Sequence, residues 1–261
     1  MTTTTITTEE VKKLRDVTGI SVMQCKKALE EASGDMNKAL VILKKKSTEI
    51  AAKKSEREAK EGRIAVKTTP GKAAVITVNC ETDFVARNED FINLADLLVG
   101  EVLNHGIEST KQKASELINP VIQKIGENIQ LGEIDVIEGE NLGTYVHDSK
   151  IAVVVSLTGG DPSLAKNIAM QVAAMNPEYL RRVDIDEEVK KTATEIFEKE
   201  VAEMDKPDEI KERILQGKID DYFKDRILLE QQFIKDDKKT IGQLLEEAGA
   251  EVKEFKRYTI T

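Results

Sequence analysis

The residue types best suited to catalysis or metal binding are scarce in this sequence. Its 261 residues include only two histidines, His105 and His147, and two cysteines, Cys25 and Cys80. A catalytic set of serine, histidine and aspartate has few ways to form from them. The His-x-x-x-His and Cys-x-x-Cys spacings of zinc sites do not occur. We therefore predict no metal site, no cofactor and no enzymatic activity, and we expect both cysteines to be buried, reduced thiols.

Phosphate-binding patterns are missing as well. The chain has neither a G-x-x-x-x-G-K-[ST] loop nor a G-x-G-x-x-G turn after a predicted strand. Its net charge of −9 argues against nucleic acid, because such binding usually shows as a basic face. Local basic runs such as Lys44-Lys45-Lys46 are typical of a solvated helix face. We expect no nucleic-acid partner.

The sequence also favours a cytoplasmic protein without a membrane partner. No apolar run reaches the roughly 20 residues that a membrane-spanning helix needs. The amino end, Met1–Ile6, has neither the basic start nor the apolar stretch of a secretory signal. Apolar residues make up 40% of the chain and charged residues 33%, which suits folded helical units with solvated faces.

One stretch, Asn79-Cys80-Glu81-Thr82-Asp83-Phe84-Val85-Ala86-Arg87-Asn88, stands out because it places a large aromatic among polar turn formers. It lies between a predicted strand and a predicted helix, and Phe84 is one of six phenylalanines in a chain without tryptophan. Loops on rigid scaffolds often carry binding residues. We predict a presented loop that contacts a partner protein. The alternative, in which Phe84 folds back to cap the hydrophobic core, stays open on composition alone.

Three short helices are predicted within residues 1–46. The patterns Thr7-x-x-Glu10 and Ser21-x-x-Gln24 mark two helix starts, and Asp35 caps the third. Because about 40 residues can share only a small core, we expect a binding module here. Residues 47–61 are rich in alanine and charge, and they predict a helical linker that is polar nearly all round.

The rest of the chain is predicted to form two related α+β subdomains with small antiparallel sheets, one of them interrupted by an inserted antiparallel helical hairpin. The first subdomain spans residues 62–142, with a β-hairpin around Pro70-Gly71. Its later elements are helices over 91–102 and 110–125, the second with a break at Pro120, and a strand over 129–137. The second subdomain comprises residues 143–183 and 235–261, with a hairpin over 144–157, a helix over 163–174, a helix over 240–248 and a closing strand over 251–261. The insertion spans 184–234, and its aromatics are predicted to be packing residues.

Comparing the two subdomains strengthens the hypothesis about Phe84. In the second copy, the turn from strand to helix is the plain Thr158-Gly159-Gly160-Asp161-Pro162. In the first copy, the same turn is the longer stretch from Cys80 to Asn88. The fold can evidently close this turn without a phenylalanine, so Phe84 is predicted to make a contact outside the chain.

Several blocks, in this order along essentially the whole chain, resemble one family. They are Leu14-Arg15-x-x-Thr18-Gly19 with Met23-x-Cys25-Lys26-Lys27-Ala28-Leu29, Asn79 to Ala86, Lys124-Ile125-Gly126-Glu127-Asn128-Ile129, Ile168-Ala169-Met170 and Thr240-Ile241-Gly242-Gln243-Leu244-Leu245. The sequence is similar to the bacterial translation elongation factor Ts family, the guanine nucleotide exchange factors for elongation factor Tu. It departs from that pattern at Val17, Val22 and Gln171.

The resemblance implies a ubiquitin-associated-like (UBA-like) fold for the amino-terminal module and elongation factor Tu as the partner. It implies that Thr82, Asp83, Phe84 and Val85 form a wedge that disturbs the magnesium and nucleotide site of that partner and so promotes GDP release. Whether Asp83 acts by its charge or by hydrogen bonding stays open. The implied contacts of the amino-terminal module are Arg15, Met23 and Lys26, and the further candidates are Ile125, His147 and Ile234.

Two other classes of function remain to be weighed. The chain could be an adaptor, in which the UBA-like module binds some other protein and the core has no exchange activity. A hydrolase is disfavoured because no catalytic site is recognisable. A homodimer through the helical hairpin is also left open.

Overall fold

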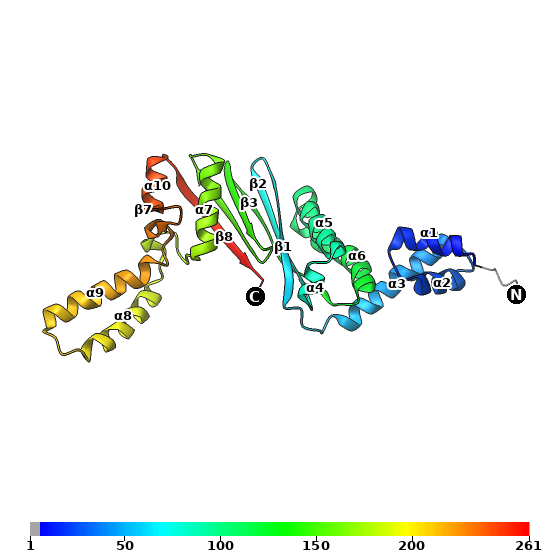
Figure 1. The fold of residues 1–261 in the computed structure, drawn as a ribbon, viewed down its shortest axis with the longest axis horizontal. Coiled ribbons are helices and arrows are strands. Elements are labelled where there is room, and N and C mark those ends of the chain that lie inside the picture. The colour runs from blue at the N-terminus through cyan, green and yellow to red at the C-terminus, as the bar shows by residue number, and fades with distance from the viewer. Residues whose placement is uncertain (1–5, 261) are drawn as a thin grey trace. The chain divides into compact units, whose positions relative to one another are not determined.

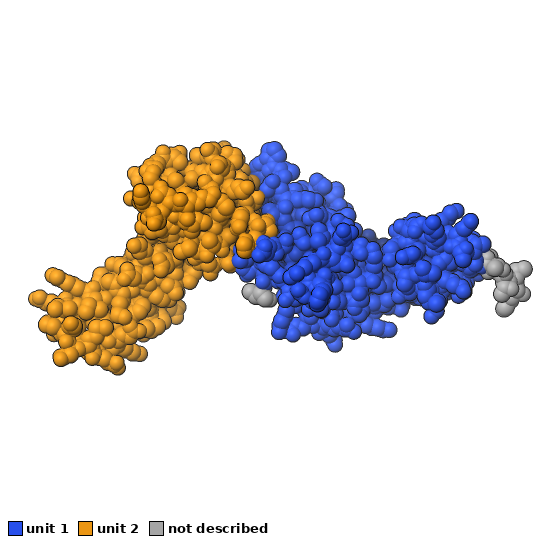
Figure 2. Space-filling view, viewed as in Figure 1, with its two compact units in different colours: residues 1–136, 148–151, 258–261 blue, residues 137–147, 152–257 orange. Residues whose placement is uncertain are grey.

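The structure is a computed structural model that describes residues 6–260 (Figure 1). Residues 1–5 and Thr261 lie outside that range. The prediction that the amino end lacks a secretory signal concerns mainly the first of these, and the predicted closing strand includes Thr261. The chain forms two compact units (Figure 2). The first comprises the chain up to Val136, with Asp148–Ile151 and the chain from Tyr258, and the second comprises Ile137–His147 and Ala152–Arg257.

The first unit begins with the three predicted helices, α1 (Thr8–Thr18), α2 (Val22–Glu31) and α3 (Met36–Lys54). The capping box before α1 is present: the backbone N–H of Glu10 donates to the Thr7 hydroxyl at 3.2 Å, and the backbone N–H of Thr7 donates to the Glu10 carboxylate at 2.8 Å. These bonds lower the pKa of Glu10. The three helices share a small core around Leu14, Cys25, Leu29 and Leu43.

The end of α3 differs from the prediction. The helix does not stop at residue 46 but continues to Lys54, so residues 47–54 of the predicted linker helix are the last part of α3. The rest of that prediction is wrong, because residues 55–60 are not helical and Glu61 begins β1. The helical part is not polar all round, because Ser47 is buried and Ile50 and Ala51 pack against the next core. These three residues lie on one face of the helix. The sequence pattern did not reveal this face, because Ser47 and Ala51 are small and charged residues stand between the residues of the face.

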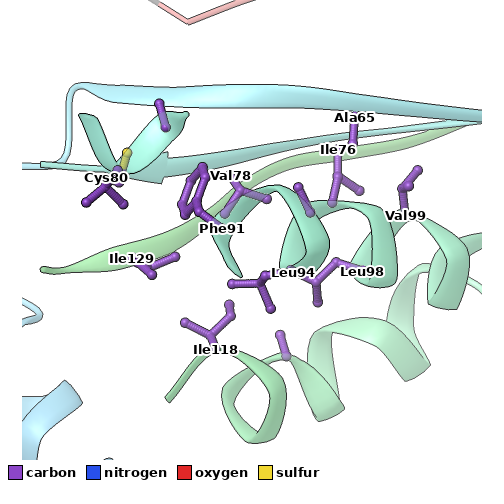
Figure 3. Packing of buried hydrophobic residues seen from close by; sticks show 14 of the residues in the cluster. Ala65, Ile76, Val78, Cys80, Phe91, Leu94, Leu98, Val99, Ile118 and Ile129 are labelled. Carbon is purple, nitrogen blue, oxygen red and sulfur yellow. The ribbon is translucent and has the colours of Figure 1, made fainter. Parts of the chain in front are cut away.

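The first sheet has the strand order β1-β2-β3, formed by β1 (Glu61–Thr69), β2 (Lys72–Cys80) and β3 (Ile129–Glu138). The strands β1 and β2 form the predicted antiparallel hairpin, with Glu61 opposite Cys80. The helix α5 (Glu89–His105) packs on this hairpin. Figure 3 shows Phe91, Leu94 and Leu98 of α5 turned toward this core, which Ile76 and Val78 of β2 also enter.

The helix α6 (Ile107–Ile125) packs against both α5 and α3. The predicted break at Pro120 is wrong, because the helix runs through this residue. Proline removes one backbone donor and strains the preceding turn. Here the buried residues Ala114, Ile118 and Ile122 hold both halves of α6 against the core. Tertiary packing therefore overrides the local signal.

The second sheet has the order β4-β5-β8, formed by β4 (Asn141–His147), β5 (Ile151–Thr158) and β8 (Glu251–Thr259). As in the first sheet, a later strand joins the second strand of the hairpin, which agrees with two related α+β subdomains. The helix α7 (Pro162–Met175) packs against β4. Each of the two sheets is thus small and packed against helix, which confirms the predicted α+β class.

The predicted helical hairpin is formed by α8 (Glu187–Ala202) and α9 (Asp208–Lys224), which pack against each other. Short 3-10 helices, η1 (Arg182–Asp184) and η2 (Leu228–Glu230), flank it. A second, two-stranded hairpin was not predicted: β6 (Gln232–Phe233) pairs with β7 (Asp236–Thr240) and leads into α10 (Ile241–Glu247). The predicted boundary between residues 234 and 235 falls in its turn. The charged sequence of β7 has no apolar alternation that would reveal a strand.

Two glycines allow a test of the packing in the second unit. A Cβ atom at Gly143 would lie 2.1 Å from the carbonyl carbon of Ala165, so β4 and α7 meet through backbone. We expect Gly143→Ala to lower the free energy of unfolding by about 2 kcal/mol or more, because the neighbour is backbone and cannot turn aside. Urea unfolding followed by circular dichroism measures this.

The matched control is Gly217→Ala in α9, where a Cβ would meet nothing within 4 Å. This change should raise stability by up to about 1 kcal/mol, because alanine is the better helix former. Equal stability of the two variants would show that Gly143 is not a close contact.

Candidate protein-binding site

The stretch from Cys80 to Asn88 is not an extended loop but contains one turn of helix, α4 (Asp83–Ala86). Thr82 is its N-cap, and the Thr82 hydroxyl accepts a hydrogen bond from the backbone N–H of Val85 at 3.4 Å. After Arg87 the chain turns directly into α5, whose N-cap is Asn88. The predicted presented loop is therefore a fixed turn between β2 and α5.

This turn separates exposed from buried side chains. Phe84 is 83% exposed, more than any other large apolar residue that the structure describes. Val85 and Ala86, by contrast, are buried in the core formed by β2, α5 and α6. The alternative in which Phe84 caps the core is thus excluded for this conformation. Val85 has almost no surface for a partner here, and it anchors the turn instead.

Two carboxylates hold the turn against the start of β3, and we call this pair, Glu81 and Glu127, the carboxylate clasp. The backbone N–H and the hydroxyl of Thr82 donate to the two carboxylate oxygens of Glu127, at 3.0 and 2.7 Å. In return, the backbone N–H of Asn128 donates to Glu81 at 2.6 Å. Hydrogen bonds to charged groups are the stronger ones, so the base of α4 is tied to a segment 45 residues further along the chain.

The role of Glu127 was not predicted. Glu127 was part of the block Lys124-Ile125-Gly126-Glu127-Asn128-Ile129 that carries the family resemblance, but no contact was predicted for its side chain. Gly126 does end α6, in the left-handed conformation with φ +88°, and Asn128 is buried with its amide donating to the Arg57 carbonyl at 2.6 Å. The sequence did contain a signal for Glu127. It lies in a polar block that carries the family resemblance, which indicates a role beyond ending the helix.

Asp83 lies beside Phe84 on the same turn and forms an ion pair with Arg87 at 3.3 Å. The Arg87 side chain is strongly exposed and that of Asp83 is about half exposed. Such a surface pair contributes little, about 1 kcal/mol at most. A partner can therefore take over the Asp83 carboxylate at low cost, and the choice between charge and hydrogen bonding stays open.

Cys80 ends β2 directly below the turn. Its thiol is buried and donates to the Thr82 carbonyl at 3.2 Å. Burial, and after it the charge of Glu127, raises the pKa of Cys80 to about 12. The thiol is therefore neutral at physiological pH and serves as a packing and hydrogen-bonding group, as predicted for both cysteines.

The amino-terminal module presents a shallow groove of about 240 Å³ between α1 and α2. Arg15 and Lys26 line it together with Lys12, and Val11 and Val22 are among its apolar residues. The groove thus combines apolar surface with a basic rim. The third predicted residue of this module, Met23, is exposed but does not line the groove.

Polar contacts join this module to the helix that leads to the clasp. The buried Ser47 hydroxyl of α3 donates to the side-chain oxygen of Gln123, whose amide donates to Gln24 of α2 at 3.2 Å. The next residue of α6, Lys124, pairs with Asp90 at 2.6 Å. The bonds of Gln123 connect α2 and α3 to α6, and the Lys124 pair connects α6 to α5; Glu127 follows two residues after the end of α6.

The remaining candidates are Ile125 in the first unit and His147 and Ile234 in the second. Ile125 is half-buried and packs against the first core. His147 ends β4, where its ring stacks with Tyr145 and its Nδ1 lies 3.3 Å from the Tyr145 hydroxyl. Ile234 is exposed in the turn after β6, and its backbone N–H donates to buried Gln171 at 2.9 Å.

Gln171, one of the departures from the family pattern, has a clear structural role. It is fully buried in α7, and its side-chain nitrogen donates to Gln231 and to the Gln232 carbonyl, both at 3.0 Å. With the bond from Ile234, one amide side chain satisfies three groups of the β6 segment. Gln171 therefore fixes the position of Ile234.

The described part of the chain shows neither a candidate metal site nor a membrane-spanning helix. Within residues 6–260, no group of three or more His, Cys, Asp and Glu side chains is arranged to hold a metal ion. No helix in that range is long and apolar enough to cross a membrane.

Comparisons with known proteins identify the class. A family model described as "Elongation factor TS" matches residues 81–261. The chain is 39% identical to elongation factor Ts of Hydrogenobaculum sp. (strain Y04AAS1), with 98% of each chain covered, and 39% identical to that of Hahella chejuensis (strain KCTC 2396), covering 98% of this chain and 92% of the relative. Elongation factor Ts of Deinococcus deserti (strain DSM 17065 / CIP 109153 / LMG 22923 / VCD115) is 38% identical, with 97% of this chain and 98% of the relative covered.

A family model over more than half of the chain and relatives over nearly its full length define a translation elongation factor. The chain belongs to the elongation factor Ts family.

The environment of Cys80 predicts how the thiol behaves with pH. In a Cys25→Ser variant, native Cys80 should resist Ellman's reagent at pH 8, where an unfolded cysteine with an ordinary pKa near 8.5 is partly ionised. Because the folded pKa is the higher one, the contribution of the neutral thiol to stability is full below about pH 8.5 and declines as the pH rises toward 12. Rapid labelling of the native protein at pH 8, as fast as in urea, would contradict this.

Proposed function

We propose that this chain is a guanine nucleotide exchange factor that binds elongation factor Tu and promotes GDP release during translation elongation. The observation that carries the proposal is the exposure of Phe84 on a turn that the carboxylate clasp holds in place. The family membership supports a role in translation elongation. We expect this activity in the cytoplasm.

The mechanism is thermodynamic coupling and needs no covalent chemistry. An exchange factor binds best to the state of its partner that holds GDP poorly. By linkage, GDP then weakens the binding of the exchange factor by the same factor. Surface residues of the right shape and rigidity are sufficient for this task, and a catalytic side chain is not required.

Phe84 suits the role of a wedge between elements of the partner. An aromatic ring buries a large apolar area with only two rotatable bonds, so little conformational entropy is lost when it is inserted. Its position on a fixed turn lowers that cost further, because the backbone is already ordered before binding. In the proposed complex, Phe84 and Asp83 enter near the magnesium and nucleotide site of elongation factor Tu, while Thr82 and Val85 hold the turn.

The groove of the amino-terminal module supports a second contact with the same partner. Arg15 and Lys26 offer charge beside apolar surface, and Met23 adds exposed apolar area nearby in sequence. This combination is complementary to a surface of the partner that is apolar and has an acidic rim. Ile125, His147 and Ile234 stay predicted contacts of other surfaces.

The wedge predicts a large effect of removing one side chain. Phe84→Ala should leave the fold intact and slow stimulated GDP release from elongation factor Tu at least about tenfold, or about 1.4 kcal/mol of lost barrier lowering. Stopped-flow measurement with a fluorescent GDP gives the rate. Val183→Ala, which truncates another strongly exposed apolar residue, is the matched control and should change the rate by less than about twofold. Unchanged release with Phe84→Ala would exclude the wedge.

The clasp predicts that Glu127 acts only through the turn. Glutamine at this position can accept one of the two Thr82 hydrogen bonds and leaves the other donor without its acceptor. Glu127→Gln should slow stimulated GDP release about three- to tenfold, but should have little further effect when combined with Phe84→Ala. Glu116→Gln, on the exposed side of α6, is the control. Effects of Glu127→Gln and Phe84→Ala that multiply independently would show that Glu127 does not position Phe84.

The competing function is an adaptor that binds through its amino-terminal module without stimulating exchange. The exchange assay separates the two, since an adaptor would bind elongation factor Tu or another protein and leave GDP release at its basal rate. A homodimer through the helical hairpin stays a prediction.

A further inference from the structure

The helical hairpin carries a groove that the proposed exchange function does not use. It has a volume of about 880 Å³ and lies along α8. Its floor is apolar, formed mainly by Val189, Ile196, Phe197 and Tyr222. Ile196 is 52% exposed, whereas its neighbours on α8, Val189, Ala193 and Phe197, pack in the core of the hairpin. An apolar groove of this size beside solvent points to an occupant.

The floor of the groove is already ordered. The rings of Phe197 and Tyr222 meet edge to face with centroids 5.5 Å apart, and Tyr222 meets buried Phe223 in the same way at 5.0 Å. The guanidinium of Arg226 lies 3.8 Å from the Tyr222 ring centroid. These contacts fix the aromatic rings, so binding does not have to order them first.

The charge around the groove is strongly negative. From its N-cap Asp186 to its C-cap Glu203, α8 contains seven acidic residues and three lysines, a net charge of −4 within a chain of −9. Asp186, Glu187 and Glu188 all line the groove. Glu187 pairs with Lys190 at 2.7 Å, whereas Asp186 and Glu188 have no ion-pair partner within residues 6–260.

Acids at the start of a helix also stabilise it by themselves, because they complement its positive end. The Asp186 side chain makes no capping hydrogen bond, so any such stabilisation comes from charge alone. This role does not account for the apolar residues that line the groove next to the acids. The combination of the two is what selects a ligand.

We propose that this groove binds an amphipathic helix of another protein, one with an apolar face flanked by lysine or arginine. The groove residues Val189, Ala193 and Ile196 recur at the i, i+4, i+7 spacing through which helices pack side by side. The basic residues of the ligand would pair with Asp186 and Glu188. Nucleic acid is excluded as the occupant because its phosphates would face these acids. Two copies of this chain that paired groove to groove would bring both acidic rims into one interface, which is unfavourable.

The test uses the full chain and a fluorescent synthetic peptide of about 18 residues, made of leucine and lysine in an amphipathic helical pattern. Anisotropy titrations give Kd at two salt concentrations. Ile196→Ser should raise Kd at least about fivefold by removing apolar contact. Asp186→Asn with Glu188→Gln should raise Kd at least about fivefold at low salt and flatten its salt dependence.

The matched controls lie on α9. Ile210→Ser alters another exposed isoleucine, and Asp208→Asn with Glu209→Gln neutralises two acids in the first turn of that helix, outside the groove. Both should keep Kd within about twofold, and a leucine and glutamate peptide of the same pattern should not bind. None of the groove variants should alter stimulated GDP release, which separates this proposal from the exchange function.

Three results would overturn the proposal. The first is a leucine and lysine peptide that binds the groove variants as tightly as the unmodified chain, since this would show attraction to overall negative charge. The second is equal binding of the leucine and glutamate peptide. The third is a dimer of the chain alone in light scattering that Ile196→Ser dissociates, because the occupant would then be a second copy.

Discussion

The hydrogen bonds from Thr82 to Glu127 are the interaction on which the binding surface depends. A single helical turn such as α4 is not stable alone, because ordering its first residues costs more than the few backbone bonds return. Here the two donors of one residue meet the two oxygens of one carboxylate, at 3.0 and 2.7 Å. The same residue caps α4. The clasp and the buried side chains of Val85 and Ala86 therefore supply the order that the turn lacks by itself.

This order makes the exposure of Phe84 informative. Burying a phenylalanine typically contributes about 2 kcal/mol, so a chain that leaves one in water forgoes that stability. A flexible loop could hide the ring against the core. The clasp prevents this, because it fixes the turn with Phe84 outward and Val85 inward. Exposure is thus built into the local structure, and a partner that receives the ring gains the apolar burial that folding gave up.

Local signals predicted most of the fold, and distant contacts account for what they missed. The caps at Thr7 and Thr240 and the Pro70-Gly71 turn involve neighbours in sequence, and the predicted elements begin there. The continuation of α3 to Lys54 and the unbroken helix at Pro120 depend on packing between helices far apart in sequence. For the site, composition and the duplicated turn predicted Phe84. Glu127 was missed because its partner lies 45 residues away.

The net charge of a chain does not show how charge is distributed over its surface. The net charge of −9 is an average over two grooves of opposite charge. The groove of the amino-terminal module is lined by Lys12, Arg15 and Lys26, and the hairpin groove is lined by acids. Each also has apolar surface. Like charges across an interface are costly, so a ligand suited to one groove is repelled by the other. The two proposed ligands therefore differ in charge and would not compete for the same surface.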